Sequence, residues 1–251
     1  MRDVQFEDLG EIAYDKAWAY QESLMKANLD LKADWYKTSA PNDVYNIPTK
    51  HHLLFCEHPH VYTLGKSGHM ENLLVNDTRL KELNVSFFKT NRGGDITYHG
   101  PQQIVGYPIL DLEYFETDLG KYMRNLEEVI IRVLAHYNIH AGRLPGSTGV
   151  WLDPDIKGKA RKICAMGVRC SRWVTLHGFA FNINTDLRYF DYIVPCGITD
   201  KSVTSLEKEL GRSVNIQEVK DLLIEKFEEV FQCDILVDIN KTPNCMQATE
   251  Q

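Results

Sequence analysis

Apolar residues recur every three or four positions in three parts of the chain, which is the spacing of an amphipathic helix. We predict helices over about Glu11 to Tyr36, Leu119 to Tyr137 and Ile216 to Phe231, and the middle one has the most regular pattern. Asn215, with Glu218 three residues later, resembles a capping box at the start of the last helix. The apolar face predicted for the first helix contains Ile12, Trp18, Leu24, Ala27 and Leu31.

Short runs of apolar or β-branched residues between these helices predict strands. The segments are HHLLFCEHP, VYTLG, VSFFKT, QQIVGYPILDL, GVWLD, KICAMGVRC and WVTLHGFAFNI. Because the strands both cluster and alternate with helices, the predicted fold class is α/β (α+β), a mixed β-sheet flanked by helices. No linker or repeat divides the chain, so we expect a single domain over residues 1–240 and a polar, frayed tail over 241–251.

The composition is that of an ordinary globular protein. The chain has 251 residues, of which 43% are hydrophobic and 25% are charged, and its formal net charge is −7. This charge argues against bulk binding of nucleic acid or of an anionic membrane. The charged N-terminal segment lacks the apolar region of a signal peptide, and no run is long enough to span a bilayer. We therefore expect a cytoplasmic protein with no nucleic-acid or membrane partner.

Six cysteines are scattered along the chain without any C-x-x-C pair, as expected of reduced thiols. Cys196 stands out because it lies between Pro195 and Gly197 in IVPCGI, a turn that could expose a nucleophile. A nucleophilic thiol needs a base or a cation nearby. The periodicity leaves open whether His99, His177 or a lysine of the segment KGKARK would supply it.

The most unusual segment is NRGGDITYHGPQQ, which runs from Asn91 to Gln103 between two apolar strands. Adjacent glycines let a backbone approach a ligand closely, and an arginine can bond a polar group with two N–H donors. An elaborate hairpin turn is the structural alternative. The segment has neither the spacing of a phosphate-binding loop nor that of a dinucleotide site, so no nucleotide cofactor is indicated.

A basic segment, KGKARKICAMGVR, leads into a predicted strand. Its last lysine before the strand, Lys162, would carry its amine toward the interior, where it could act as a base. If residues 157–161 are extended, Lys157, Lys159 and Arg161 share the opposite face, and with Arg169 and Arg172 they are candidates for docking an acidic partner.

A metal site and a serine triad are both disfavoured. Cys56, His58 and His60 could share one face of a strand, but the apolar run that ends at Pro59 fits an ordinary strand end better. No G-x-S-x-G elbow is present for a Ser–His–Asp triad.

At these segments the chain resembles the lipoyl(octanoyl) transferases, which share a fold superfamily with biotin and lipoate ligases. The resemblance covers most of the chain. It rests on EHPHVYTLGK, RGGDITYHGPQQ, KICAMGVR, WVTLHGFAFNI, DLRYFDYIVPCGI and VTSLEKELG, in that order. It implies a biotin/lipoate protein ligase-like fold, related to class II aminoacyl-tRNA synthetases and biotin synthetases.

The resemblance also implies the site and the reaction. Cys196 would accept the acyl group and Lys162 would be its partner. The implied acyl-pocket residues are Arg92, Gly93, Gly94, Asp95, Ile96, Thr97, Tyr98, His99, Ala165, Met166, Gly167, Gly178, Phe179 and Ala180. The octanoyl group would pass from octanoyl-acyl carrier protein to a lysine of the lipoyl domains of 2-oxoacid dehydrogenase E2 subunits and of glycine cleavage H protein, without a cofactor.

The chain departs from the family pattern at two positions. Gln102 replaces the glycine that usually follows the proline of H-G-P-G-Q, and Cys164 replaces the Ala or Ser two residues after Lys162. Cys164 is therefore a rival thiol near the site. An ATP-dependent lipoate or biotin ligase and a non-catalytic acyl- or carrier-binding module are the two alternative functions.

Overall fold

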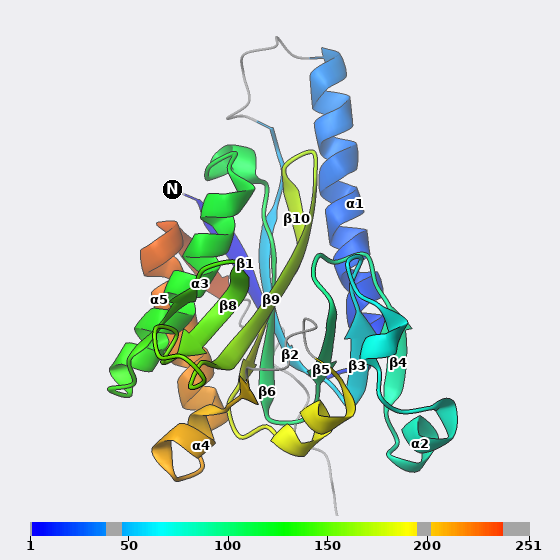
Figure 1. Cartoon of the computed structure of the whole chain (residues 1–251). Coiled ribbons are helices and arrows are strands. Elements are labelled where there is room, and N and C mark those ends of the chain that lie inside the picture. The colour runs from blue at the N-terminus through cyan, green and yellow to red at the C-terminus, as the bar shows by residue number, and fades with distance from the viewer. Residues whose placement is uncertain (1, 39–46, 195–201, 238–251) are drawn as a thin grey trace, which may run out of the picture.

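The computed structural model describes residues 2–38, 47–194 and 202–237 (Figure 1). Its helices are Tyr14–Thr38 (α1), Asp77–Glu82 (α2), Leu119–His136 (α3), Leu206–Leu210 (α4) and Ile216–Phe231 (α5), with 3-10 helices at Met70–Asn72 (η2), Leu112–Tyr114 (η3) and Leu187–Tyr192 (η4). Its strands are Asp3–Glu11 (β1), His51–Glu57 (β2), Val61–Leu64 (β3), Ser86–Lys89 (β4), Ile96–His99 (β5), Gln103–Ile109 (β6), Ala141–Leu144 (β7), Ser147–Leu152 (β8), Arg161–Ser171 (β9), Val174–Asn182 (β10), Ser202–Val203 (β11) and Asp234–Val237 (β12).

Within the described ranges, nine strands form one large sheet and three form a second, smaller sheet. The large sheet runs β12-β1-β2-β6-β10-β9-β8-β7, with β11 paired to β9. β1 pairs in parallel with both β2 and β12, whereas β2, β6, β10, β9, β8 and β7 pair antiparallel, so the predicted mixed sheet is confirmed. The small sheet, β4-β3-β5, was not expected.

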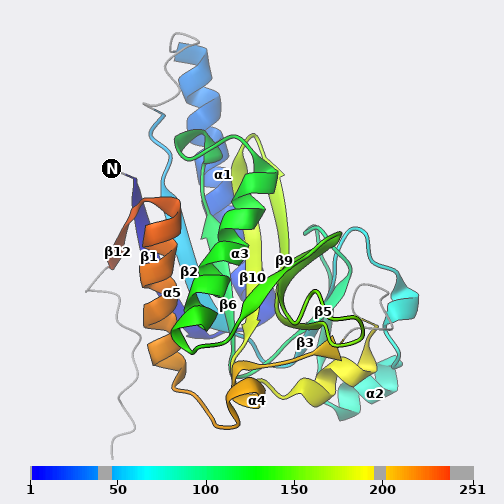
Figure 2. The same cartoon turned by 60° about the vertical axis from the view of Figure 1, so that its left-hand side comes forward.

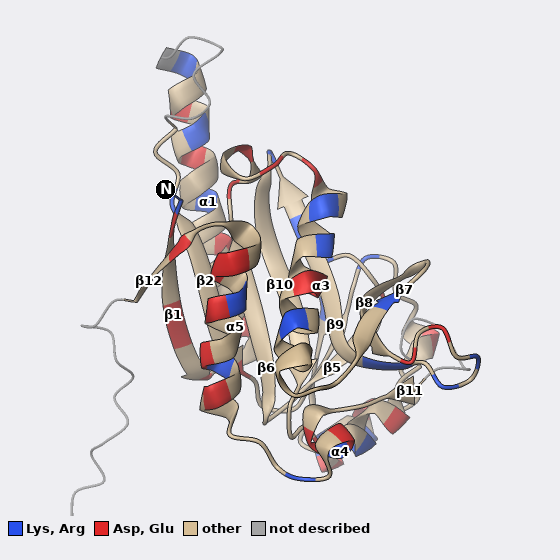
Figure 3. Cartoon of the chain, turned by 90° about the vertical axis from the view of Figure 1, so that its left-hand side faces the viewer, with Lys and Arg blue, Asp and Glu red and all other residues tan. Residues whose placement is uncertain are grey.

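Helices cover both faces of the large sheet, as predicted. Figures 1 and 2 show α1 along one face and the pair α3 and α5 along the other. The small sheet lies beside the lower part of the large sheet, next to the N-terminal end of α1, where Tyr14 stacks on Phe88 of β4 (Figure 1). The outer faces of α3 and α5 carry interspersed basic and acidic residues (Figure 3). No helix in the described ranges is long and apolar enough to cross a membrane.

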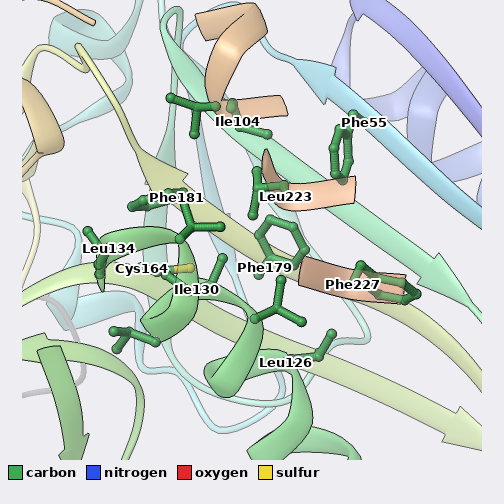
Figure 4. Close-up of a cluster of buried hydrophobic side chains, with 14 of the residues drawn as sticks. Phe55, Ile104, Leu126, Ile130, Leu134, Cys164, Phe179, Phe181, Leu223 and Phe227 are labelled. Atoms are coloured by element: carbon green, nitrogen blue, oxygen red, sulfur yellow. The ribbon is translucent and has the colours of Figure 1, made fainter. Parts of the chain in front are cut away.

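The main hydrophobic core lies between the large sheet and the helices α3 and α5. Figure 4 shows Leu126, Ile130 and Leu134 of α3 facing Phe179 and Phe181 of β10. The predicted apolar positions of α3 supply this contact, and the predicted bounds of α5 match the structure. At the start of α5, Asn215 accepts a hydrogen bond from the amide of Gln217, as an N-cap does.

The buried face of α1 differs from the predicted face. It contains Ala17, Gln21, Met25, Asn28 and Lys32, while the predicted Ala27 is exposed. Three of these five residues are polar, so apolar periodicity could not identify this face. Each polar side chain has a partner: Gln21 accepts from His177 N, Asn28 bonds both backbone polar groups of Lys50, and Lys32 pairs with Asp111.

Among the described strands, β1, β5, β7, β11 and β12 escaped the sequence analysis. β1 alternates apolar and charged residues over a short stretch, and its strand conformation depends on parallel partners from distant parts of the chain. β5 forms the second half of the glycine-rich segment and pairs antiparallel with β3. The segment from Asn91 to Gln103 is therefore a loop followed by a strand and a turn, rather than a single hairpin turn.

We expect Lys32→Met to lower the free energy of unfolding by about 3–5 kcal/mol, because it leaves the Asp111 carboxylate buried without its cation. Both side chains of this pair are almost fully buried, at 1% and 0% exposure, and Nζ lies 2.7 Å from Asp111 Oδ1. Urea denaturation measures the change. Lys26→Met is the matched control on the same helix: its pair with Asp30 is exposed, so its loss should stay within about 0.5 kcal/mol. Equal losses in the two variants would contradict the expectation.

Candidate functional site

A pocket of about 510 Å³ opens between the small sheet, the loop at residues 91–95 (the glycine loop) and the strands β6, β9 and β10. This size is typical of a site for a small organic group. Of the residues implied by the resemblance, the pocket is lined by Arg92, Gly93, Gly94, Asp95, Ile96, Thr97, His99, Lys162, Ala165, Met166, Gly167, Gly178, Phe179 and Ala180. The segment 92–99 and the β9–β10 hairpin, which are far apart in the sequence, therefore meet at one site.

Tyr98 is the exception among the described residues, because it lies behind the pocket and does not line its wall. Its ring is fully buried and stacks on Tyr189 at a centroid distance of 5.0 Å. Its hydroxyl bonds His60 Nδ1 at 2.7 Å. Tyr98 thus supports the small sheet.

Small residues form the floor of the pocket. In the antiparallel pair β9–β10, Ala165 lies opposite Ala180 and Gly167 lies opposite Gly178. A Cβ on Gly167 would lie 2.7 Å from Gly93 O, and one on Gly178 would overlap Gly106 O. Side chains at these positions would push the glycine loop away from the sheet or force the central strands apart.

Arg92 holds the glycine loop in place. Its guanidinium group is buried and donates to Thr63 O at 2.6 Å, Asp95 O at 2.8 Å and Gly93 O at 3.0 Å. The arginine therefore cross-links the loop to β3 through backbone carbonyls.

Two histidines in the pocket wall are neutral at neutral pH. Burial lowers the pKa of His99 well below its usual range, with smaller effects from His58 and Arg92, and His99 Nδ1 bonds Gln103 Oε1 at 2.9 Å. Burial, with Arg92 next, lowers the pKa of His177 to about 3. His177 Nε2 lies 2.6 Å from Asn91 Oδ1, and the residue has a left-handed φ of +62° within β10. Such strain is typical of residues that line functional sites.

Lys162 reaches the pocket because of a β-bulge. Along β8, the neighbouring residues Val150 and Trp151 pair with Cys164 and Lys162, so Ile163 is an extra residue on β9. A bulge redirects the side chains beside it. Lys162 Nζ lies over the Trp151 ring, 4.7 Å from its centroid, and a Cβ on Gly149 would touch the lysine side chain at 3.5 Å.

Cys164 is turned away from Lys162 by the same bulge. Its side chain is fully buried in the main core beside Ile130, Leu134 and Phe181 (Figure 4). Burial raises its pKa well above that of an ordinary thiol, so it is a poor nucleophile at neutral pH. Cys196, the predicted nucleophile, lies outside the described residues.

The histidines considered for metal binding have other partners. His58 bonds Ile12 O and the Tyr107 hydroxyl, both at 2.7 Å, and burial lowers its pKa to about 4. His60 bonds Tyr98 on the small sheet. In residues 2–38, 47–194 and 202–237, no three His, Cys, Asp or Glu side chains are placed to share a metal ion.

The basic residues around β9 do not form one surface. Residues 157–160 are a turn and not an extended strand, and Arg161 pairs with Glu209 and Asp153. Arg169 pairs with Glu22. Lys157 and Arg172 lie in turns beyond the opposite ends of β9, whose 11 residues span roughly 35 Å. The prediction that Lys157, Lys159 and Arg161 share one face of an extended segment was therefore wrong.

Sequence reasoning missed several wall residues: Tyr14, Val105, Tyr107, Met123 and Phe190. Met123 belongs to the apolar pattern of α3, and such a pattern does not distinguish a core position from a pocket position. Tyr14 stacks on His99 at a centroid distance of 5.9 Å, and burial raises its pKa to about 12. Only the fold brings these residues to the site.

Gln102 occupies the turn between β5 and β6 with a left-handed φ of +63°. Its amide donates to Glu57 Oε2 at 2.6 Å, and its carbonyl accepts from Asn184 N and Thr185 Oγ1, both at 3.1 Å. The glutamine thus adopts a backbone conformation that glycine adopts without strain. These three bonds use backbone atoms of Gln102, so they do not depend on its side chain.

Comparison with known proteins adds to this geometry. Residues 13–228 match the family model described as lipoyl protein ligase A/B catalytic domain. The chain is 54% identical to an octanoyltransferase of Christiangramia forsetii over 93% of this chain and 98% of that protein. It is also 54% identical to an octanoyltransferase of Flavobacterium johnsoniae, over 94% and 99% of the two chains.

Solved structures of lower identity share the fold. A bipartite lipoate protein ligase of Thermoplasma acidophilum matches with a TM-score of 0.64 and 17% identity, over 94% of this chain and 86% of that one. A lipoate-protein ligase A bound with ATP matches with a TM-score of 0.63 and 18% identity, over 94% and 88%. The expected fold class is confirmed.

We expect Gln102→Gly to change the free energy of unfolding by less than about 1 kcal/mol, because relief of the left-handed strain offsets the lost side-chain bond to Asn184. Gln102→Val should destabilise the protein by about 1–3 kcal/mol, because a β-branched residue fits this conformation poorly. Thermal unfolding of the two variants measures both changes. If valine is tolerated as well as glycine, the turn does not have this conformation in solution.

Proposed function

The chain belongs to the lipoyl protein ligase A/B catalytic domain family, and from this we propose how it carries out octanoyl transfer. The relatives at 54% identity are octanoyltransferases, and this chain is an acyltransferase of the same kind, acting in protein lipoylation. Our proposal concerns the residues, the intermediate and the partners.

A single observation carries the proposal: Lys162 and the three implied acyl-binding segments line one pocket. Much of its wall is apolar, including Ile96, Val105, Met166 and Phe190. An octanoyl chain has about seven methylene-scale groups to bury, at roughly 0.8 kcal/mol each. Neutral histidines suit such a wall, since a charged imidazolium beside an acyl chain would be poorly solvated.

In the first half-reaction, the Cys196 thiol loses its proton to the neutral amine of Lys162 and attacks the carbonyl carbon of the octanoyl thioester. The new carbon–sulfur bond forms as the donor thiolate leaves and takes the proton back from Lys162. The exchange of one thioester for another is nearly balanced in free energy, so no ATP is needed. Backbone N–H groups of the glycine-containing turns stabilise the oxyanion.

In the second half-reaction, an acceptor lysine attacks the acyl-enzyme. The amine gives a proton to Lys162, the amide bond forms, and the Cys196 sulfur leaves and takes that proton from Lys162, which restores the thiol and the neutral amine. An amide is more stable than a thioester, which drives transfer to the acceptor. The two residues therefore perform both halves without a cofactor.

We assign octanoyl-acyl carrier protein as the donor. The acceptors are lipoyl domains, and we propose those of 2-oxoacid dehydrogenase E2 subunits and the glycine cleavage H protein. The bipartite ligase of Thermoplasma acidophilum is described together with its E2 lipoyl domain, which supports an acceptor of this kind. The proposed unit is one domain over residues 1–240, with the tail at 241–251 outside the described residues.

Intact mass after mixing with octanoyl-acyl carrier protein tests the proposal. One octanoyl group should appear on the protein, and peptide mapping should place it on Cys196. Adenylation in the presence of ATP and octanoate, without any acyl-enzyme, would instead indicate a ligase. Binding without either adduct would indicate a non-catalytic module.

Cys196→Ser should abolish transfer, because an alkoxide is far harder to generate than a thiolate. Cys164→Ser should keep most of the activity, since Cys164 lies in the core away from the pocket. Transfer is measured by the mass of an acceptor lipoyl domain. If Cys164→Ser abolishes transfer while Cys196→Ser stays active, the nucleophile is Cys164 and not Cys196.

Lys162→Arg keeps a positive charge but cannot act as a base near neutral pH. We expect turnover to fall by about 100-fold or more, the usual contribution of general base catalysis. Lys159→Arg, in the exposed turn before β9, is the matched control and should be as active as the natural chain. Near-normal turnover of Lys162→Arg would mean that its charge alone matters.

A further inference from the structure

The segment that leads to Cys196 is anchored to a loop beside the pocket. Val194 N donates to Asn72 O at 2.8 Å, Leu74 N donates to Tyr192 O at 2.9 Å, and Leu73 and Ile193 form an antiparallel bridge. Cys196 follows Val194 by two residues. Because Pro195 has no N–H group, the amide of Val194 is the last backbone donor before Cys196 itself.

The Asn72 side chain connects this anchor to the pocket wall. Asn72 Nδ2 donates to Asp95 Oδ2 at 2.6 Å. The other carboxylate oxygen, Asp95 Oδ1, accepts from Ile96 N at 2.6 Å, and Asp95 O accepts from Arg92 Nη2 at 2.8 Å. Asp95 lines the pocket, and the same Arg92 holds the glycine loop. The aspartate is therefore fixed from three sides.

We propose that Asn72 and Asp95 are positioning residues for Cys196, which act through the backbone of Val194. The chain of contacts runs from the Asp95 carboxylate to the Asn72 amide, and from the Asn72 carbonyl to Val194. The side-chain amide of Asn72 bonds Asp95, and its backbone carbonyl accepts from Val194 N. The side-chain bond therefore holds the carbonyl that contacts the segment leading to Cys196. This inference rests on the proposed role of Cys196 as nucleophile.

The chemistry of the pair favours this role over a direct contact between Asp95 and substrate. An amide–carboxylate bond is charge-assisted and stronger than a bond between neutral groups. Both carboxylate oxygens of Asp95 already accept hydrogen bonds, and neither an octanoyl chain nor a thioester offers a hydrogen-bond donor. The carboxylate thus has a structural partner and no evident partner on the acyl group.

The test exchanges the two groups. Asn72→Asp alone places two carboxylates against each other and removes the donor. In the double variant Asn72→Asp/Asp95→Asn, the new amide at 95 can donate to the carboxylate at 72 while its oxygen still accepts from Ile96 N. The double variant also restores the net charge of the natural chain.

Two readouts are measured on the full chain. The first is the single-turnover rate of octanoyl-enzyme formation from octanoyl-acyl carrier protein, together with KM and the unfolding temperature. The second is the rate at which iodoacetamide alkylates Cys196, read by peptide mass. Alkylation requires no acyl donor, so it reports on the thiol even if the proposed function is wrong.

We expect Asn72→Asp to slow both acylation and alkylation about tenfold or more, with little change in KM or unfolding temperature. The double variant should recover most of both rates. Asn76→Asp is the matched control: it adds the same charge four residues later, at the exposed N-cap of α2, where aspartate caps as well as asparagine.

Several outcomes would overturn the inference. A double variant as slow as Asn72→Asp would mean that the Asp95 charge acts by itself. A normal rate for Asn72→Asp would mean that the pair does not position the cysteine. A drop in unfolding temperature that parallels the loss of rate would reduce the pair to a structural contact. If the natural chain forms no octanoyl-enzyme while alkylation follows the expected order, the proposed function fails and the positioning role stands.

Discussion

The absence of side chains where β10 approaches β6, and where β9 approaches the glycine loop, is the constraint on which the site depends. Gly178 has no room for a Cβ against Gly106 O, and Gly167 has little against Gly93 O. Because these backbones lie so close, the loop can rest on the sheet and leave a pocket between them. Arg92 then fixes the loop by donating hydrogen bonds to carbonyl groups of the loop itself and of β3.

A second constraint is the bulge at Ile163, which separates two residues of similar chemical interest. Regular alternation would place Lys162 and Cys164 on the same face of β9. The extra residue sends Lys162 toward the pocket and Cys164 into the core. One irregularity therefore separates Cys164 from the pocket that Lys162 lines, and it also places the Trp151 ring against Lys162 Nζ.

The sequence predicted the helices and strands better than it predicted which of their residues are buried or line the pocket. The long, regular apolar patterns of α3 and α5 were sufficient to predict these helices, because both bury apolar residues against one core. The face of α1 was not predictable from hydrophobicity, since Gln21, Asn28 and Lys32 are buried with partners from distant segments. For the site, the motifs identified three wall segments, but Tyr14 and Met123 reach the pocket only through the fold. The bulge has no signature in a single sequence.

The parallel pairing of β1 with β12 bears on the order in which the chain folds. Near that edge, Arg2 Nη1 donates to Phe231 O across 229 positions of sequence. Pairing over such a separation requires almost the whole chain, and contacts of this kind form slowly. The hairpin β9–β10, by contrast, is local, and it carries both Lys162 and the small-residue floor. During synthesis, the central strands can pair before β12 has left the ribosome. The half of the sheet that lines the pocket is thus available early, and the outer edge is the last part to close.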